Sequence, residues 1–416
     1  MKVLMFSMDK TLLGVNESGG DAIKRHRSYG EFCDELNIIV FCKREYQKQQ
    51  LADNIFVWPT NSVFKFNYFC DAYKIAKNIY KDSVFNLVIG DLFTALPAWF
   101  LKIKYKTKFL MHFHGDFWQN KSALEKKLHN YFILLLSKFL VHRADAVRVV
   151  SSGIKNKLIK SGVEKNKIYV IPTPSDLSKF LTFDQARVYE LKQKFQTDFL
   201  PDGPAGSQGL QTDFSQGQEE TSSKEGLKTS SKEGLKLKIL LFVGRIEAVK
   251  NLDWFLNVFM EVKNKYNNIK LLIIGEGKEK ENLKLKVKDL NLEDTVKFLG
   301  TVEYNDLTNY YHLADVFVLP SLSESFGKVL VEAGVSGIPC VASATTGAKE
   351  IIQDNKTGFL APINNKNNFI NKILKLLEDE KLANKIGENA REFVLENFNG
   401  DVQTKKIIKL WQSLVF

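Results

Sequence analysis

The sequence has few cysteines and no long uninterrupted hydrophobic run. Its 416 residues include only four cysteines, which lie far apart and form no Cys-x-x-Cys pair, so we expect neither a disulfide framework nor a zinc ribbon. The longest apolar run, residues 131–141, is interrupted by Ser137 and Lys138 and is shorter than the ~20 residues that a membrane-spanning helix needs. These absences predict a protein that does not cross a membrane and that works in the reducing cytoplasm.

No Asp-x-Asp triplet occurs in the sequence, so the carboxylate ligands that usually hold a phosphate-bound metal ion are missing. We therefore expect no metal and no other cofactor. What the chain does contain is ordinary for a globular protein, with 44% hydrophobic and 26% charged residues. Its length suits two or three domains.

Positive charge is concentrated in the first part of the chain. The net charge is +11, and residues 1–180 hold 28 Lys and Arg against 16 Asp and Glu. Such an excess suits an anionic partner, which is a membrane surface, a phosphorylated substrate or a nucleic acid, although solvated lysines without a partner explain it equally well. We expect no nucleic acid. A local cluster, Lys102, Lys104, Lys106 and Lys108, suits either an anionic membrane or an exposed loop.

A low-complexity segment divides the chain. Residues 221–228 are repeated without change at 229–236, and residues 196–199 recur at 211–214. Because the segment has too few large apolar groups to offset the entropy of ordering, we expect residues 196–236 to be disordered. We predict a first domain over 1–180, a linker with this insert over 181–236, a second domain over 237–396, and a helix over 397–416 that returns to the first domain.

Both halves alternate short β-branched runs with longer amphipathic stretches, which is the pattern of βαβ units. Each short run is mostly apolar, as expected for parallel strands covered on both faces. The predicted fold class is α/β, with two doubly wound Rossmann-like domains facing each other across a cleft. The expected strands are residues 2–7, 38–41, 87–89, 108–111, 146–150 and 168–171 in the first half, and 238–243, 270–274, 296–299, 316–319 and 340–342 in the second.

The segment 320–333, PSLSESFGKVLVEA, follows the apolar run 316–319 and begins with a Ser-rich turn. A strand, a turn and then Gly327 at the start of an amphipathic helix place backbone N–H groups where a phosphate can bind, beside Phe326 and Lys328. Glu324 and Glu332 are just over two helical turns apart, so one carboxylate can reach each end of a ligand. Ionised carboxylates accept hydrogen bonds from sugar or ribose hydroxyls.

This segment resembles the E-x7-E signature of the retaining family 4 glycosyltransferases of the GT-B fold, and further matches fall in order around it. Residues 242–251 (FVGRIEAVKN) resemble the family's strand followed by Gly-Arg and Lys-Asn, and residues 314–321 resemble its Ala-Asp strand followed by Pro-Ser. In the first half, residues 18–26 resemble the loop with Ser-Gly-Gly and Arg-His, and residues 114–115 resemble the His-Gly after the fourth strand. The resemblance covers nearly the whole chain except the insert. It implies that the first domain binds the acceptor and the second binds the donor.

The resemblance assigns roles residue by residue. Arg245 and Lys250 neutralise the leaving diphosphate, Glu332 holds the ribose, and Glu324 orients the transferred sugar. Two cations and a helix N-terminus meet phosphate charge without a metal. With His114 beside the sugar, the expected catalytic residues are Glu324, Arg245, Lys250 and His114. The expected donor-binding residues are Gly20, Gly244, Arg245, Lys250, Glu324, Ser325, Phe326, Gly327, Lys328, Val329 and Glu332.

The sequence departs from the family pattern at two places. Lys349 stands where the family has Pro before Glu-Ile-Ile, and residues 173–175 (TPS) replace its Asn-Gly-Val. Neither change removes a group that we assign to the chemistry. Of the two histidines that follow the strand 108–111, we expect His112 to be an ordinary structural residue and His114 to lie in the cleft.

The resemblance implies a retaining glycosyltransferase that moves a sugar from a nucleotide diphosphate donor to a hydroxyl acceptor. The acceptor is expected to be a glycan or a lipid-linked molecule, in cell-envelope polysaccharide, lipopolysaccharide or glycolipid assembly, with peripheral contact to the inner face of the plasma membrane. Two alternatives stay open. A nucleotide-sugar epimerase of similar fold needs a poised acid and base, and a non-catalytic nucleotide-sugar-binding member would lose the phosphate cations or the glutamates.

Overall fold

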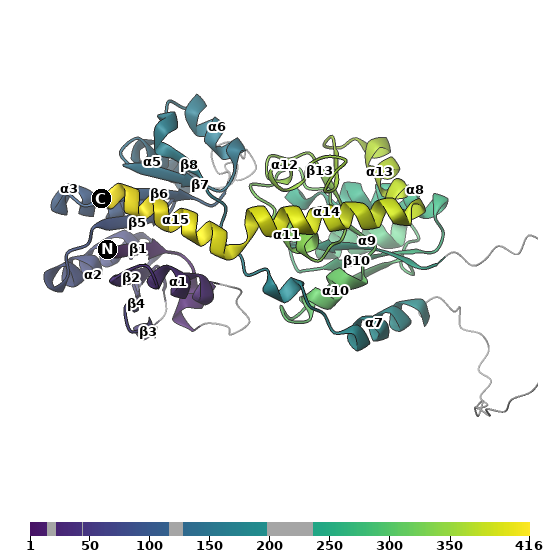
Figure 1. Cartoon of the computed structure of the whole chain (residues 1–416), viewed down its shortest axis with the longest axis horizontal. Helices are drawn as coiled ribbons and strands as arrows, with labels where there is room; N and C mark the ends of the chain where they lie inside the picture. The colour runs from purple at the N-terminus through teal and green to yellow at the C-terminus, as the bar shows by residue number, and fades with distance from the viewer. Residues whose placement is uncertain (15–21, 44, 116–127, 198–235) are drawn as a thin grey trace, which may run out of the picture.

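The computed structural model describes residues 1–14, 22–43, 45–115, 128–197 and 236–416. They form two α/β domains that lie next to each other along the long axis of the molecule (Figure 1). Gly20 and most of the low-complexity insert, residues 198–235, fall outside the described residues. Among the described helices none is long and apolar enough to cross a membrane.

The first domain is built on an eight-stranded sheet of order β3-β4-β2-β1-β5-β6-β7-β8, in which only β3 is antiparallel to its neighbour. Val3 and Met5 of β1 belong to one hydrophobic cluster, and Leu4 and Phe6 belong to another. Because successive side chains of a strand point to opposite faces, helices cover both faces of this sheet. The strands are β1 (Lys2–Ser7), β2 (Glu35–Val40), β3 (Gln49–Ala52), β4 (Ile55–Pro59), β5 (Leu87–Asp91), β6 (Lys108–Phe113), β7 (Ala146–Val149) and β8 (Ile168–Val170), and the helices are α1 (Ala22–Gly30), α2 (Tyr68–Asp82), α3 (Ala95–Tyr105), α5 (Leu128–Val141) and α6 (Ser152–Lys160).

The second domain is built on a six-stranded parallel sheet of order β11-β10-β9-β12-β13-β14. All six residues of β9 and of β10 are buried, as expected for central strands between two helix layers. The strands are β9 (Lys238–Val243), β10 (Ile269–Ile274), β11 (Val296–Gly300), β12 (Val316–Leu319), β13 (Cys340–Ser343) and β14 (Phe359–Ala361), and the helices are α7 (Gln185–Thr197), α8 (Leu252–Lys265), α9 (Lys280–Asp289), α10 (Leu307–Leu313), α11 (Lys328–Val335), α12 (Ala348–Ile351) and α13 (Lys366–Glu378).

Two consecutive helices, α14 (Glu380–Phe398) and α15 (Gly400–Val415), run from the second domain back across the first (Figure 1). Asn399 separates them with an extended backbone, and its side chain accepts a hydrogen bond from the Asp401 N–H at 2.9 Å. This contact caps the new helix. Trp411 of α15 is fully buried and packs edge-on against Tyr29 of α1, with ring centroids 5.2 Å apart. The chain end therefore belongs to the core of the first domain.

The structure differs from the sequence-based expectation in its details. The short strands β3, β4 and β14 were not expected, because three to five residues carry little periodic signal. Residues 185–197, which the sequence assigned to a linker, form α7. Its Leu191 and Phe195 are buried in the core of the second domain, so this helix is a packed part of that domain.

Candidate active site

The carboxyl ends of the two sheets meet at a cavity of about 310 Å³ between the domains. Open α/β sheets bind ligands at this end of their strands. The first domain contributes Arg25, His114, Val150, Thr173 and Ser175, and the second contributes Glu324, Ser325, Phe326, Gly327 and Lys328. The expected turn of the second domain therefore faces His114 across the cleft.

The turn after β12 has the predicted form of a strand, a bend and a helix that starts at Lys328. Gly327 has φ +89°, a left-handed conformation that favours glycine, and an added Cβ would lie 3.2 Å from Leu330 Cδ1. The first N–H groups of a helix have no carbonyl partner within the helix and carry a partial positive charge. Gly327 thus sets the direction in which the N-terminus of α11 points, toward the cavity.

Glu324 lies in this turn and forms an ion pair with Lys250. The Lys250 ammonium lies 2.7 Å from Glu324 Oε1 and 3.2 Å from Oε2, and the two side chains are only 13% and 14% exposed. Lys250 ends a short 3-10 helix in the loop after β9, residues 248–250. The strand order places β9 next to β12, so two separate sequence motifs meet at one point.

Glu332 lies deeper in the second domain and is buried. It accepts a hydrogen bond from the Tyr311 hydroxyl at 2.9 Å, and its other oxygen lies 3.8 Å from Lys328 Nζ. Burial and the neighbouring carboxylate raise the pKa of Tyr311 well above its usual value. Tyr311 therefore keeps its proton and holds the Glu332 carboxylate in place.

Arg245 is not brought into the cavity. Its side chain is 76% exposed and forms an ion pair with Glu247 at 2.8 Å. Gly244, just before it, has φ +154°, and an added Cβ there would lie 3.4 Å from Phe242 Cζ. Val329 is half-buried at the start of α11. Of the second-domain residues expected to bind the donor, residues 324–328 thus line the cavity and Lys250 contacts Glu324, whereas Arg245 is exposed and paired with Glu247.

A second cavity of about 390 Å³ lies at the carboxyl end of the first sheet and shares Arg25, His114 and Thr173 with the first cavity. Its other polar side chains come from widely separated parts of the chain. They include Ser7, Asp9, His26, Tyr29, Asp91, His112 and Arg148. The two cavities together extend from the turn of the second domain into the first domain.

Three histidines in this region stay neutral near pH 7. Burial and Arg25 lower the pKa of His26 to about 4, and its ring bonds the Ala22 carbonyl at 2.8 Å. Burial and Arg148 hold the pKa of His112 well below the usual range. Desolvation and Arg148 also lower the pKa of His114, although its side chain is exposed in the open cleft. Neutral imidazoles both donate and accept hydrogen bonds, which suits hydroxyl groups.

The structure adds observations on His112, which the sequence predicts to be an ordinary structural residue. It is buried, lines the first-domain cavity, and its Nε2 has no hydrogen-bond partner within the described part of the chain. Its ring lies 5.6 Å from that of His114. The proximity of the two histidines could have been predicted from the sequence, because residues two apart on a strand share a face and both histidines follow the same strand core. Arg25 and Arg148 also line this cavity.

The two domains touch beside the cleft. Glu350 of α12 accepts a hydrogen bond from the Ser152 N–H at 2.7 Å, at the N-terminus of α6 in the first domain. Phe326 packs against the hydrophobic clusters of both domains. The cleft is therefore bounded by direct contacts between its two walls.

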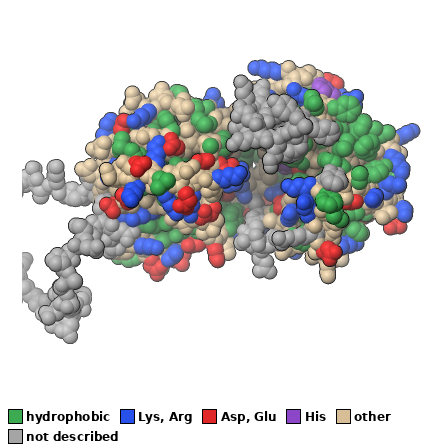
Figure 2. Space-filling view, turned by 180° about the vertical axis from the view of Figure 1, so that it is seen from behind, with side chains coloured by type: hydrophobic (Ala, Val, Ile, Leu, Met, Phe, Trp, Pro, Cys, Tyr) green, Lys and Arg blue, Asp and Glu red, His purple; other side chains and the backbone are tan. Residues whose placement is uncertain are grey.

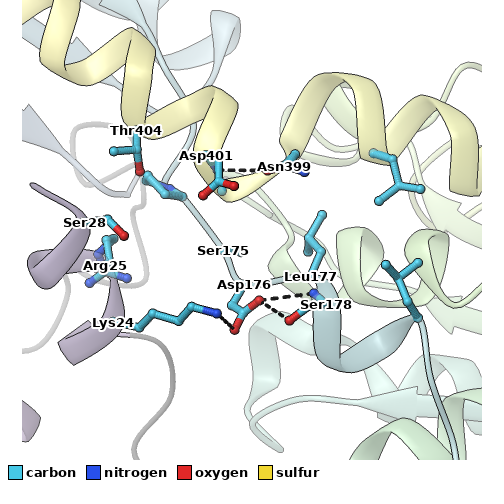
Figure 3. A pocket seen from close by; sticks show the side chains of 14 residues that line it. Lys24, Arg25, Ser28, Ser175, Asp176, Leu177, Ser178, Asn399, Asp401 and Thr404 are labelled. Atoms are coloured by element: carbon cyan, nitrogen blue, oxygen red, sulfur yellow. Dashed lines mark hydrogen bonds and ion pairs between the residues drawn. The ribbon is translucent and has the colours of Figure 1, made fainter. Parts of the chain in front are cut away.

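A smaller cavity of about 220 Å³ lies where the chain passes between the domains (Figure 3). Asp176 accepts hydrogen bonds there from Lys24 Nζ and Ser178 Oγ, both at 2.6 Å. Partial burial raises the pKa of Asp176, but these hydrogen bonds outweigh it and lower the pKa. The ion pair ties α1 to the connecting segment.

Two family models match consecutive parts of the chain. The model "Glycosyltransferase Family 4" matches residues 36–179, and the model "Glycosyl transferases group 1" matches residues 223–393. The chain belongs to the family 4 glycosyltransferases. The two matches confirm the resemblance that the motifs of this family 4 member indicated.

Individual known proteins are also similar to this family 4 member. It is 32% identical over 179 residues to an N-acetyl-alpha-D-glucosaminyl L-malate synthase of Bacillus anthracis, a match that covers 43% of this chain and 45% of that one. The chain spans about half the length of the first curated relatives that it matches. Among solved structures, a sucrose-phosphate synthase from Thermosynechococcus elongatus has a TM-score of 0.75 at 20% identity, over 99% of this chain and 98% of that one.

A second solved structure, HepE of Anabaena with UDP and glucose, has a TM-score of 0.72 at 16% identity, over 99% of this chain and all of that one. At such identities the similarity shows the fold. It confirms the predicted GT-B arrangement of two Rossmann-like domains with a returning C-terminal helix. In the described residues of this family 4 member, no group of three or more His, Cys, Asp or Glu side chains is placed to hold a metal ion.

Proposed function

We propose that this protein is a retaining glycosyltransferase that transfers a sugar from a nucleotide diphosphate donor to a hydroxyl acceptor. The observation that carries the proposal is the composition of the cleft. One wall holds the Lys250–Glu324 ion pair beside the N-terminus of α11, and the other holds His114 and Arg25 in the same cavity. This pairing gives cations for a leaving diphosphate and polar side chains for hydroxyl groups.

The donor lies on the wall of the second domain in this proposal. Transfer leaves negative charge on the diphosphate, and preorganised cations and helix N-terminal N–H groups stabilise such charge as it develops. Lys250 exchanges Glu324 for phosphate oxygens when the donor binds, and Glu324 then accepts hydrogen bonds from the sugar. Glu332, oriented by Tyr311, holds the ribose. Arg245 reaches the diphosphate only after it leaves Glu247, which its high exposure allows.

The acceptor lies in the cavity of the first domain. His114 stands where the two cavities join, and His26 and His112 line the deeper part. As the resemblance implies, the acceptor hydroxyl attacks on the same face that the diphosphate leaves, and the leaving phosphate takes the hydroxyl proton. Retention then needs no pair of carboxylates of the kind that glycosidases use.

Transfer without a metal ion is part of the proposal and rests on the cationic groups already present. Lys328 lines the cavity, Lys250 contacts Glu324, and with the N-terminus of α11 they would supply the positive charge that a metal ion otherwise gives to a diphosphate. Uridine diphosphate sugars are the first donors to test, because the solved structures of the similar HepE hold UDP or UDP-glucose. The acceptor class is a glycan or a lipid-linked hydroxyl in cell-envelope assembly on the cytoplasmic side.

A thermal-shift series tests the donor site. The protein is titrated with UDP, GDP, ADP and their sugars, first with EDTA and then with Mg²⁺, and the same series is run on Lys250→Ala, Arg245→Ala and Glu332→Ala. We expect one nucleotide to raise Tm in the presence of EDTA, and the three variants to lose most of this rise. A rise that needs Mg²⁺ would contradict the metal-free proposal, and no response to any nucleotide would overturn the donor site.

Product analysis separates the proposal from its rivals. The donor sugar identified above is incubated with the protein, and the nucleotide and sugar are separated by chromatography. Release of the nucleoside diphosphate, slowly by hydrolysis and faster with an acceptor, supports transfer. An epimerised sugar still attached to its nucleotide would indicate an epimerase, and an unchanged donor that nevertheless binds would indicate a non-catalytic member.

A further inference from the structure

Two neighbouring helices of the first domain expose large apolar side chains. Ile103 of α3 is 58% exposed and Leu135 of α5 is 65% exposed. Phe100 of α3, Phe139 of α5 and Phe93, just before α3, are between 40% and 45% exposed. Soluble proteins seldom gather several such side chains in one place without a partner. We call these five residues the α3–α5 face.

The α3–α5 face is continuous. Phe100 and Ile103 lie one helical turn apart on α3, and Leu135 and Phe139 lie one turn apart on α5. Trp99 joins the two rows, since its ring lies 5.2 Å from Phe139 and 5.1 Å from Phe100. Figure 2, which views the molecule from behind, shows hydrophobic side chains gathered over the first domain with Lys and Arg at its outer edge.

Positive charges predominate in the sequence of the helices that carry this face. Residues 92–115 and 128–144 contain no Asp or Glu. Lys102 pairs with Asp145 at 2.9 Å. Lys104, Lys106, Lys108 and Lys138 are exposed at the surface. The Arg143 guanidinium lies 3.4 Å from the centre of the Phe139 ring, so this cation sits directly on the apolar row. The occupant of the face must therefore be apolar in its interior and negatively charged at its surface.

We propose that the α3–α5 face docks the protein on an anionic lipid bilayer. A bilayer offers both features, because aromatic and aliphatic side chains enter the region between headgroups and acyl chains while lysines remain at the level of the anionic headgroups. A protein partner with matching acidic and apolar patches is the rival occupant. The bilayer is favoured because the face combines exposed Phe, Ile and Leu side chains with several long cations at its margin.

One end of the α3–α5 face lies beside the first-domain cavity. Phe93 lies two residues after Asp91, which lines the first-domain cavity. Both α3 and α5 follow strands whose carboxyl ends form that cavity. A docked protein thus has one end of the face beside the cavity that we assign to the acceptor. Docking itself does not depend on the proposed transfer, although it would bring a lipid-linked acceptor to its site.

Vesicle sedimentation tests docking. The full chain is mixed with vesicles of phosphatidylcholine alone or of phosphatidylcholine with phosphatidylglycerol, and the bound fraction is measured without any nucleotide. We expect binding to the anionic vesicles that weakens as salt is added. Lys104→Gln with Lys106→Gln should weaken partition about fivefold for each lysine, and Ile103→Ser with Leu135→Ser should weaken it about tenfold or more.

Matched controls lie on the second domain. Leu285 on α9 is 64% exposed, and Leu285→Ser should leave partition unchanged, as should Lys265→Gln with Lys288→Gln. The melting temperature of each variant shows that it is folded. Equal binding by the face variants and the controls would overturn the proposal. Absence of vesicle binding, together with self-association by light scattering that Ile103→Ser with Leu135→Ser abolishes, would assign the face to a second copy of the chain instead.

Discussion

The two walls of the cleft are built in different ways. The wall of the second domain consists of one turn after β12 and one lysine from the loop after β9, joined by the Lys250–Glu324 ion pair. The wall of the first domain is assembled from single side chains on β1, α1, β5, β6 and β7. The wall of the second domain is thus mainly a local motif of consecutive residues. The wall of the first domain consists of residues that only folding brings together, which suits a site whose ligand differs between enzymes of one fold.

The largest expected effect tests the local motif. Lys250→Ala removes the cation nearest to the turn and leaves Glu324 partly buried without its partner. We expect kcat/KM for sugar transfer to fall by about 10² to 10³, the usual loss when one preorganised charge-stabilising group is removed. Initial rates with the donor found by thermal shift measure this effect. Lys265→Ala, at an exposed lysine of α8, is the matched control. A Lys250 variant within twofold of wild type would show that the ion pair is not part of the donor site.

The second effect concerns stability and belongs to the first-domain wall. The pKa of His26 is about 4 in the folded protein against 6.5 for an unperturbed histidine. Below pH 6.5 the unfolded chain takes up a proton that the folded chain does not, so stability falls as pH falls toward 4 and is regained above 6.5. This single group accounts for about 3 kcal/mol of that loss.

His26→Gln isolates this contribution. We expect the variant to lose less stability than wild type between pH 7 and pH 4, as measured by urea unfolding at each pH. Carboxylates also titrate in this range, and the difference between variant and wild type removes their share. His142→Gln, at an exposed position, should follow wild type. Parallel curves for His26→Gln and wild type would show that burial of His26 does not destabilise the protein in acid.

The third effect separates the two walls by kinetics. His112→Ala removes a ring that lines the first-domain cavity and whose Nε2 has no hydrogen-bond partner among the described residues. One hydrogen bond to the acceptor is worth up to about tenfold in acceptor KM, while slow hydrolysis of the donor, which needs no acceptor, should stay at the wild-type rate. His142→Ala is again the control. A loss of donor hydrolysis equal to the loss of transfer would place His112 in the structure of the whole cleft and not in acceptor binding.

The same contrast explains what the sequence could predict. The strands that carry long apolar runs, β1, β9 and β12, were found with the bounds that the structure shows. The short strands β3, β4 and β14 and the helix α7 were missed, because runs of three to five residues give no clear period and because α7 adjoins low-complexity sequence. The form of the turn after β12 was found for the same reason as the long strands, since its residues are consecutive.

Side-chain partners could not be predicted in this way. The sequence names Arg245 and Lys250 as equivalent cations, yet the structure pairs one with exposed Glu247 and the other with Glu324 at the cleft. The choice depends on where the loop after β9 lies relative to β12, which is a tertiary property. His112 was set aside because a histidine beside a strand is usually structural. The structure adds that His112 lines the first-domain cavity.

The smallest expected effect concerns the contact that joins the two walls. Glu350 accepts a hydrogen bond from the N–H of Ser152 at the N-terminus of α6, where the helix dipole favours a negative charge. Removing the carboxylate should make domain closure less favourable by about 1 kcal/mol, because the Ser152 N–H then forms a hydrogen bond with water instead. For Glu350→Ala we therefore expect a larger radius of gyration in X-ray scattering and nucleotide affinity lowered about fivefold. Glu388→Ala, at an exposed residue of α14, should change neither. An unchanged radius of gyration with unchanged affinity would mean that packing of Phe326 against both domains holds the walls together without this charge.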